Sequence, residues 1–419
     1  MKGKILAISS IFLALALVLA YGGEAAEEVR LGALYPLSGK AARSGQETVE
    51  AIKLAVDVIN GKHDIDLPLA RTAGLPNLGG AKVRLILEDH AASPEKGRAI
   101  AERFITSEKV HVLQGAFHSA VAAPSSHVAE KYGIPYVTGE SEDPRLTARG
   151  FKTFFSVTPT TDNIVQDFFA FLEGITKKKG LSVKKIAVIH ANDLWGTGLA
   201  IAAKKYYKQH GMKIVADIGY SPALPDLKSE VLQLKKAAPD VVFQASFDND
   251  AILSVKSYRA LRFSPMAVIA MGASFSSPNF IGALGPDADY NFSHTKFHAS
   301  LVKTRKAARA ISDLFQKRTG KPIWGTPARA FTATIVIAEA VNRAGSLEPG
   351  AIIKALRETD LKAGDTIMPY RGVKFNEKGQ NVRAQGLITQ IRGGKHYVVW
   401  PFEFAQREAV FPMPPWSER

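Results

Sequence analysis

Short apolar runs alternate with amphipathic stretches along most of the chain. Apolar runs with turn residues at both ends are typical of buried strands, and apolar residues spaced three and four apart are typical of helices. The predicted strands cover residues 29–34, 83–87, 110–113, 134–137, 185–190, 212–218, 240–245 and 266–271. The predicted helices cover residues 46–60, 94–107, 120–132, 163–174, 199–210, 227–237 and 249–262. This alternation favours an α/β fold with parallel sheets between layers of helices.

The alternation of strands and helices occurs twice. After the first series, residues 151–161 have the pattern of a crossing segment, and a second series of the same plan begins at residue 163. Three further helices and three terminal strands are predicted at residues 303–318, 332–344, 349–359, 370–375, 384–392 and 396–400. Two units of one plan indicate two lobes, and 419 residues are enough for two hydrophobic cores.

Two loops in the first series form the clearest candidate for a binding site. Residues 115–119 (GAFHS) connect a predicted strand to a helix, and residues 138–143 follow the next strand. Both loops are expected at the carboxyl edge of one parallel sheet, where α/β proteins bind ligands. The N–H groups at the helix start, together with the hydroxyl of Ser119, favour an anion. The alternative is two ordinary surface loops, because few such loops bind anything.

The first 25 residues have the pattern of a secretory signal. Lys2 and Lys4 precede an apolar run over residues 5–20, and small residues flank Glu24 at a cleavage position. An uncleaved anchor is the alternative, although the apolar run is short for a membrane-spanning helix. We therefore expect a cleaved signal peptide and a soluble periplasmic protein.

Composition narrows the classes of partner and site. The sequence has no cysteine, which excludes disulfides, thiolate catalysis and cysteine-bound metals. The formal net charge of +15 favours acidic partners. The lysines, however, occur mostly in short runs typical of solvated helix faces, without interleaved aromatic residues. Nucleic acid is therefore not an expected partner.

The motifs of common enzymes are missing from the sequence. It has no nucleophile elbow, no zinc-binding histidine motif and no phosphate-binding loop. His118 beside Ser119 is the one arrangement that suggests a base and a nucleophile, but adjacent residues rarely face each other productively. We expect a protein that is not an enzyme and has no metal and no cofactor.

Four stretches, in order along the chain, resemble the branched-chain amino acid type (Leu/Ile/Val-binding-protein-like) substrate-binding proteins of ABC transporters. They are residues 30–39 (RLGALYPLSG), 115–119 (GAFHS), 143–147 (DPRLT) and 189–198 (IHANDLWGTG). The turn at residues 375–381 and the closing stretch 399–405 also fit, so the resemblance covers nearly all of the expected mature chain.

The resemblance implies a type I periplasmic binding protein fold, in which two Rossmann-like lobes are joined by a hinge of three crossings. The first lobe would comprise residues 26–159 and 296–371, and the second residues 160–295 and 372–419, with the third crossing near Arg371. A solute would close the lobes, and a membrane permease with its ATPase would recognise the closed form.

The resemblance also implies a solute site between the lobes. Ser119 would bind a carboxylate, Trp195 would form an apolar wall, and Glu142 stands where relatives often have Ser or Thr. Glu142 would repel an acid unless it points away or serves a different group. The candidate ligand-binding residues are Ser44, Phe117, His118, Ser119, Ser141, Glu142, Trp195, Phe247, Asp248 and Ser274.

The expected solute is a small carboxylate, an amino acid or an amide. The positions that hold the ammonium group in relatives are Phe247 and Ser274 here, and neither is a carboxylate. Asp248 or Glu142 could substitute for the missing acid. An unpaired ammonium group in a dry cleft is costly, which favours an apolar or aromatic carboxylate, or an amide, over a standard α-amino acid.

Two other functions stay open on the sequence. One is an exported or membrane-associated ligand sensor of the same fold, although no fused DNA-binding or membrane segment is visible. The other is an exported hydrolytic enzyme on an α/β scaffold. Turnover of a substrate that is lost in Ser119→Ala or His118→Ala would favour this enzyme.

Overall fold

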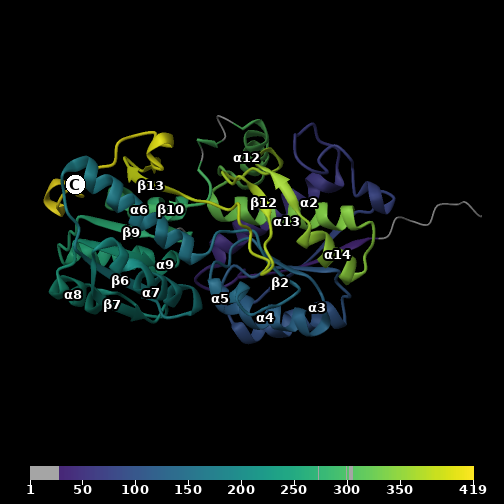
Figure 1. Ribbon diagram of the computed structural model, residues 1–419, viewed down its shortest axis with the longest axis horizontal. Helices are drawn as coiled ribbons and strands as arrows, with labels where there is room; N and C mark the ends of the chain where they lie inside the picture. The colour runs from purple at the N-terminus through teal and green to yellow at the C-terminus, as the bar shows by residue number, and fades with distance from the viewer. Residues whose placement is uncertain (1–27, 272, 299, 302–304) are drawn as a thin grey trace, which may run out of the picture.

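The computed structural model describes residues 28–271, 273–298, 300–301 and 305–419 (Figure 1). Two lobes lie side by side, each built on its own β-sheet, which confirms the predicted α/β architecture. The expected signal segment, residues 1–25, lies outside the described residues. In the described part of the chain, no helix combines the length and the hydropathy that a membrane crossing requires.

The first lobe contains a five-stranded parallel sheet with the order β2-β1-β3-β4-β5. Its strands are β1 (Val29–Tyr35), β2 (Val83–Asp89), β3 (Val112–Gly115), β4 (Tyr136–Thr138) and β5 (Phe154–Ser156). Helices α3 (Pro94–Thr106) and α4 (Ser119–Tyr132) pack together on one face, and α2 (Ala42–Asn60) packs with α13 (Gly325–Ala344) on the other. The lobe also contains α5 (Pro144–Thr147), α12 (Lys306–Thr319), α14 (Pro349–Arg357), β11 (Asp360–Lys362) and β12 (Gly372–Lys374).

The second lobe contains a seven-stranded sheet with the order β14-β13-β10-β9-β8-β6-β7. The parallel strands are β6 (Lys185–Ala191), β7 (Lys213–Tyr220), β8 (Val241–Ala245), β9 (Ala267–Ala270) and β10 (Phe292–Thr295). The hairpin β13 (Leu387–Arg392) and β14 (Lys395–Trp400) adds an antiparallel edge. The helices are α6 (Thr161–Lys179), α7 (Leu194–Tyr206), α8 (Lys228–Ala237), α9 (Asp248–Ala260) and α10 (Pro278–Leu284).

Local sequence fixes the helix ends that border the crossing and the candidate loops. Helix α4 ends at Gly133 with φ +70°, a left-handed conformation that glycine adopts without steric cost, as the sequence predicts. Helix α6 begins directly after the first crossing, and a capping box between Thr160 and Asn163 satisfies its first N–H groups. Hydrogen bonds within residues 160–163 therefore fix where the first helix of the second lobe begins.

The third crossing lies later in the chain than its expected position near Arg371. Strand β12 pairs with β11, and Val373 and Phe375 are buried in the core of the first lobe. Gln380 forms a bridge with Ser156 at the edge of the same lobe. Residues 372–385 therefore contact the first lobe, and the chain enters the second lobe only with β13, which begins at Leu387. The short partner strand β11 has too little pattern of its own to predict this pairing.

Strand β10 and the start of helix α13 differ from the sequence prediction. Strand β10 lies in a region whose sequence shows little periodicity, because this short strand is buried on both of its faces. Helix α13 begins at Gly325 rather than at residue 332, and the additional first turns carry Thr326 and Arg329. These additional turns, and the chain directly after β10, supply three side chains to the region between the lobes.

Candidate functional site

Loops at the carboxyl ends of four parallel strands meet between the lobes. The loop after β3 carries Phe117 and His118, and the loop after β4 carries Glu140 and Glu142. From the second lobe, Trp195 lies in the first turn of α7 after β6, and Phe247 caps α9 after β8. This is the edge at which open α/β sheets bind ligands, and both lobes present it to each other.

Four rings from the two lobes form a continuous aromatic cluster, defined as Phe117, His118, Trp195 and Phe247. The ring centroid of His118 lies 4.9 Å from that of Phe117 and 4.9 Å from that of Phe247. The Trp195 and Phe247 centroids are also 4.9 Å apart. Burial, with His90 nearby, lowers the pKa of His118 to about 3, so this ring is neutral at neutral pH. The cluster is therefore an uncharged apolar contact across the lobe interface.

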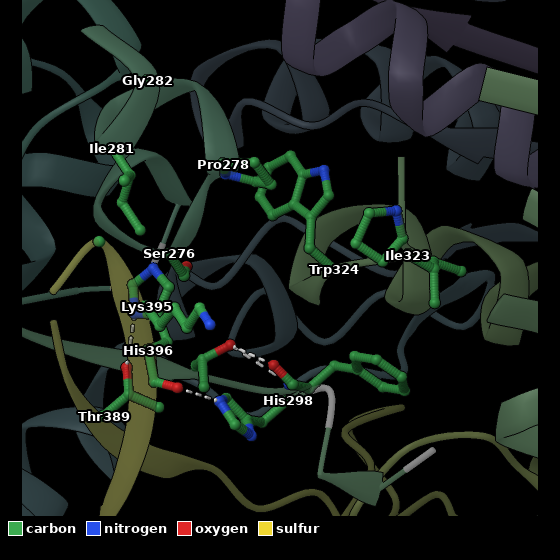
Figure 2. Close-up of a pocket in the computed structure, with 14 residues that line it drawn as sticks. Ser276, Pro278, Ile281, Gly282, His298, Ile323, Trp324, Thr389, Lys395 and His396 are labelled. Carbon is green, nitrogen blue, oxygen red and sulfur yellow. Dashed lines mark hydrogen bonds between the residues drawn. The ribbon is translucent and has the colours of Figure 1, made fainter. Parts of the chain in front are cut away.

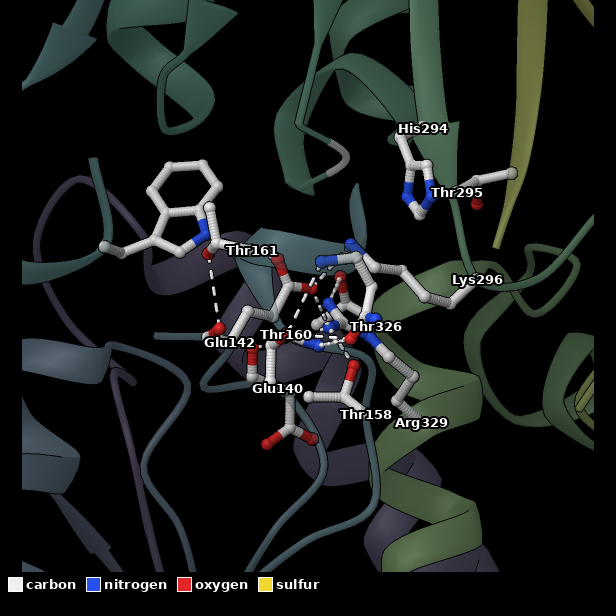
Figure 3. A network of polar contacts seen from close by, with 12 residues as sticks. Glu140, Glu142, Thr158, Thr160, Thr161, His294, Thr295, Lys296, Thr326 and Arg329 are labelled. Atoms are coloured by element: carbon white, nitrogen blue, oxygen red, sulfur yellow. Dashed lines mark hydrogen bonds and ion pairs between the residues drawn. The ribbon is translucent and has the colours of Figure 1, made fainter. Parts of the chain in front are cut away.

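A buried ion cluster is formed by Glu142, Lys296 and Arg329 (Figure 3), and Trp195 of the aromatic cluster contacts it. Lys296 Nζ is 2.6 Å from Glu142 Oε1, and Arg329 pairs with the same oxygen. The other oxygen, Oε2, accepts a hydrogen bond of 3.3 Å from Trp195 Nε1. All three charged side chains are at most 5% exposed. The carboxylate of Glu142 thus joins α13 of the first lobe, the second crossing and α7 of the second lobe.

The surroundings of Glu142 keep it ionised. Burial on its own raises the pKa of Glu142, but Lys296 and Arg329 hold that pKa below its ordinary value. Burial lowers the pKa of Lys296 to about 8 against the opposing effect of Glu142. The expected repulsion between Glu142 and an acidic solute is therefore offset, because the negative charge of Glu142 is paired with two positive charges.

Glu140 differs from Glu142 in its charge state. It accepts a hydrogen bond of 3.2 Å from the Tyr35 hydroxyl, and it is buried beside Arg329. Burial raises its pKa to about 7, although Arg329 and Tyr35 oppose the rise. When Glu140 is protonated, two cations face the single negative charge of Glu142. The polar side of the cleft then has a net positive charge, which suits an anion.

The space enclosed by these groups is small. A cavity of about 20 Å³ is lined by Phe117, Glu140, Glu142, Trp195, Phe247, Thr326 and Arg329. That volume is enough for about one water molecule. Direct contacts across the interface also hold the lobes together, including Lys40 Nζ to Pro222 O at 2.6 Å and Arg145 to Leu194 O at 2.7 Å. The structure is a closed form, so a solute enters only when the lobes separate.

Of the candidate residues, Phe117, Glu142, Trp195 and Phe247 line the cavity, and His118 packs against two of them. Others have different partners. Ser119 Oγ accepts from Asp143 N at 3.4 Å, and Ser274 Oγ donates to Ser246 O at 2.8 Å. Ser44 donates to Asp248 across the lobe interface. Ser141 is buried and its hydroxyl has no hydrogen-bond partner among the described residues. A direct role of each in solute binding stays a prediction.

Sequence reasoning missed Glu140, Lys296 and Arg329. A signal existed for Arg329, because it is the one charged residue between Gly325 and Ala338 of α13, and arginine is almost never fully buried without a partner. Lys296 had no comparable signal, since strand β10 itself was not predicted. Glu142 and Arg329 are 187 residues apart in the sequence, so no local pattern links them.

The sequence of this chain fits a known family over nearly its whole described length. A family profile described as "Periplasmic binding protein" matches residues 28–395. The chain belongs to this periplasmic binding protein family. Within it, the chain is of the branched-chain amino acid type, as the resemblance predicts. It is 30% identical over 409 residues to "Leu/Ile/Val-binding protein homolog 7" of Brucella suis biovar 1 (strain 1330), covering 96% of this chain and 98% of that protein.

Solved structures with the same fold have been determined with different solutes. The branched-chain amino acid transporter substrate-binding protein of Streptococcus pneumoniae, in complex with isoleucine, has a TM-score of 0.75 at 19% identity. The match covers 92% of this binding protein and all of that one. A solute-binding protein of an ABC transporter from R. palustris, in complex with benzoate, also has a TM-score of 0.75 at 19% identity, covering 89% and 96%. Similarity at this level shows the fold, a type I periplasmic binding protein.

Proposed function

We propose that this binding protein is the periplasmic solute receptor of an ABC importer and that its solute is a small aromatic carboxylate. The observation that carries the proposal is the pairing of two buried cations, Lys296 and Arg329, with one carboxylate beside the aromatic cluster. When the lobes separate, these cations can accept a second carboxylate, supplied by the solute. The rings of Phe117, Trp195 and Phe247 then provide flat surfaces for its aromatic part.

The acidic groups near the cleft argue against a standard α-amino acid. Glu142 is already paired with two cations, and Asp248 is bonded to Ser44. Ser274, at the position that holds the ammonium in relatives, donates to a backbone carbonyl. The remaining acid of the lining, Glu140, accepts a hydrogen bond from Tyr35, and burial raises its pKa to about 7. A solute ammonium group would therefore lie close to Lys296 and Arg329 without a fully ionised free acid, which is unfavourable in a buried site. The benzoate complex of the R. palustris protein supports an aromatic acid on this fold.

Thermal denaturation with a panel of solutes tests this proposal. Benzoate and hydroxylated benzoates are expected to raise the melting temperature in a concentration-dependent way, because they bind only the folded protein. Leucine and isoleucine are the matched controls and are expected to have little effect. Stabilisation by leucine but not by any aromatic acid would contradict the proposed solute class and leave the receptor role intact. Consumption of the solute would instead indicate an enzyme.

Replacing the indole in the cleft is expected to weaken solute binding. In Trp195→Ala the solute loses a flat apolar contact, and we expect a loss of about 1–3 kcal/mol in binding free energy. The measurement is a calorimetric titration with the best solute of the panel. Trp416→Ala is the matched control, because that indole donates to Phe263 O and packs on the core of the second lobe. Equal affinities of the two variants would remove Trp195 from the site.

A further inference from the structure

The interface between the lobes is loosely packed in one place and closely packed in another. Beside the second crossing, a hollow of about 520 Å³ lies between the loop before α13 and the elements α10, β13 and β14 (Figure 2). The first turn of α7, by contrast, is in direct contact with the first lobe. Leu194 packs against the apolar cluster of that lobe that contains Val121 and Leu146, and Trp195 Nε1 donates to Glu142. These contacts join the two lobes, so they are lost when the lobes separate.

Arg145 of the first lobe contacts the same turn of α7. Its Nη2 donates to Leu194 O at 2.7 Å and to Thr197 Oγ1 at 3.2 Å. The Thr197 hydroxyl can accept because it donates its own hydrogen to Asp193 O at 2.6 Å. Trp195 lies between the two residues that Arg145 contacts. The guanidinium therefore holds the part of α7 that carries the indole of the cleft.

Asp143 orients the Arg145 side chain. Its Oδ1 accepts from Arg145 N and Nε, both at 2.8 Å, and its Oδ2 accepts from Nη2 at 2.6 Å. The Asp143 side chain is fully buried, and its hydrogen bonds raise the pKa of Arg145 above its ordinary value. Both residues belong to the first lobe, so the guanidinium has the same orientation when the lobes are apart. Less side-chain entropy is then lost when the contact with α7 forms.

Gly198 allows α7 to approach Asp143 closely. A Cβ at position 198 would meet Asp143 Oδ2 at 3.0 Å, which is shorter than an ordinary van der Waals contact. Two of the stretches that carry the family resemblance, residues 143–147 and 189–198, therefore meet across the lobe interface. Their contact accounts for the arginine of the first stretch and for the last glycine of the second.

We propose that Arg145 is a positioning residue for solute binding: it binds the first turn of α7 when the lobes close, keeps Trp195 at the cleft and slows the release of the solute. The inference rests on the proposed function, because it places the solute in the cleft beside Trp195. Arg145 itself lies outside the lining of that cleft. It therefore acts on the lifetime of the closed form and not on the chemical class of the solute.

Stopped-flow fluorescence of the mature chain with benzoate tests this role, because it gives the association and dissociation rate constants separately. The test variant is Asp143→Asn/Arg145→Met, which leaves no buried carboxylate without its partner and keeps a side-chain acceptor at the start of α5. We expect its dissociation rate constant to rise about tenfold and its association rate constant to stay within about twofold of the wild-type value, because the contact with α7 forms only after the solute has entered. The Arg145 side chain is 45% exposed, and solvent limits the effect.

Glu339→Gln/Arg343→Met is the matched control. Arg343 Nε and Nη2 donate to the two oxygens of Glu339 at 2.9 and 3.0 Å, and Nη2 also donates to Thr359 Oγ1 at 3.1 Å. The arrangement is the same as that of Arg145, but all of its partners belong to the first lobe. Both rate constants of this variant are expected to equal those of the wild-type protein.

An unchanged dissociation rate constant in the test variant, or an equal change in the control, would overturn the proposal. Leucine, measured in parallel, separates this result from the proposed solute class. Binding of leucine but not of benzoate by the wild-type chain would contradict that class, and about tenfold faster release of leucine by the test variant would still support the role of Arg145. A wild-type chain that binds neither probe would overturn both.

Discussion

Glu142→Gln is expected to lower the free energy of unfolding by about 3–5 kcal/mol, the cost of leaving buried charges without their partner. In the wild-type protein this carboxylate pairs with both Lys296 and Arg329, and all three side chains are at most 5% exposed. The amide of glutamine keeps the shape but carries no charge to offset the two cations. Urea denaturation at pH 7, followed by far-UV circular dichroism, measures the difference.

Glu358→Gln is the matched control for this variant. Glu358 pairs with Lys354 at 3.0 Å, but both side chains are more than half exposed. Solvent screens such a pair, and its loss is expected to change the free energy of unfolding by less than about 1 kcal/mol. A similar small effect in Glu142→Gln would show that the ion cluster is not a buried, desolvated group. The proposed anion site would then lack its electrostatic basis.

Glu140→Gln is expected to stabilise the protein at pH 8 by about 3 kcal/mol and to have no such effect below pH 4.5. The pKa of Glu140 is raised from 4.5 to about 7 in the folded protein. Between these values the unfolded chain releases the proton and the folded chain keeps it, so the wild-type protein loses stability as the pH rises. Each unit of this shift corresponds to about 1.4 kcal/mol, and glutamine has no proton to lose.

Denaturation of the Glu140→Gln and wild-type proteins at half-unit steps from pH 4 to pH 8.5 tests this effect. Glu130→Gln serves as a control of opposite sign. Its carboxylate accepts hydrogen bonds from Thr153 and from Lys152 N, which hold the pKa of Glu130 below its ordinary value despite partial burial. Its replacement is expected to destabilise the protein at neutral pH. A pH-independent effect of Glu140→Gln would show that folding does not raise the pKa of Glu140.

The pattern of apolar residues predicted most of the fold because each long strand and helix has its own periodicity. It failed where an element depends on a distant partner. Strand β12 pairs with the short strand β11, and β10 is enclosed on both faces, so neither element has a periodicity that distinguishes it. The third crossing lies later than predicted because β12 pairs with β11 in the first lobe.

The candidate site was predicted in part for the same reason. Trp195, Phe117 and Phe247 follow predicted strands, so their position at the carboxyl edge was accessible from the sequence. The role of Glu142 could not be predicted, because it depends on Lys296 and Arg329. Lys296 lies in the second crossing, and Arg329 lies in the first turns of α13, which begins earlier than predicted. The sequence alone predicts that Glu142 repels an acidic solute, whereas in the fold Glu142 forms ion pairs with two cations.

Calorimetric titration with benzoate and with benzamide, a neutral molecule of nearly the same shape, tests the central claim that two buried cations recognise a solute carboxylate. At pH 6.5 benzoate is expected to bind about tenfold or more tightly than benzamide, because charged hydrogen bonds are the stronger ones. Its advantage is expected to shrink as the pH rises through 7 and Glu140 ionises. Equal affinities for the two molecules at pH 6.5, or tighter binding of leucine than of benzoate, would contradict the account.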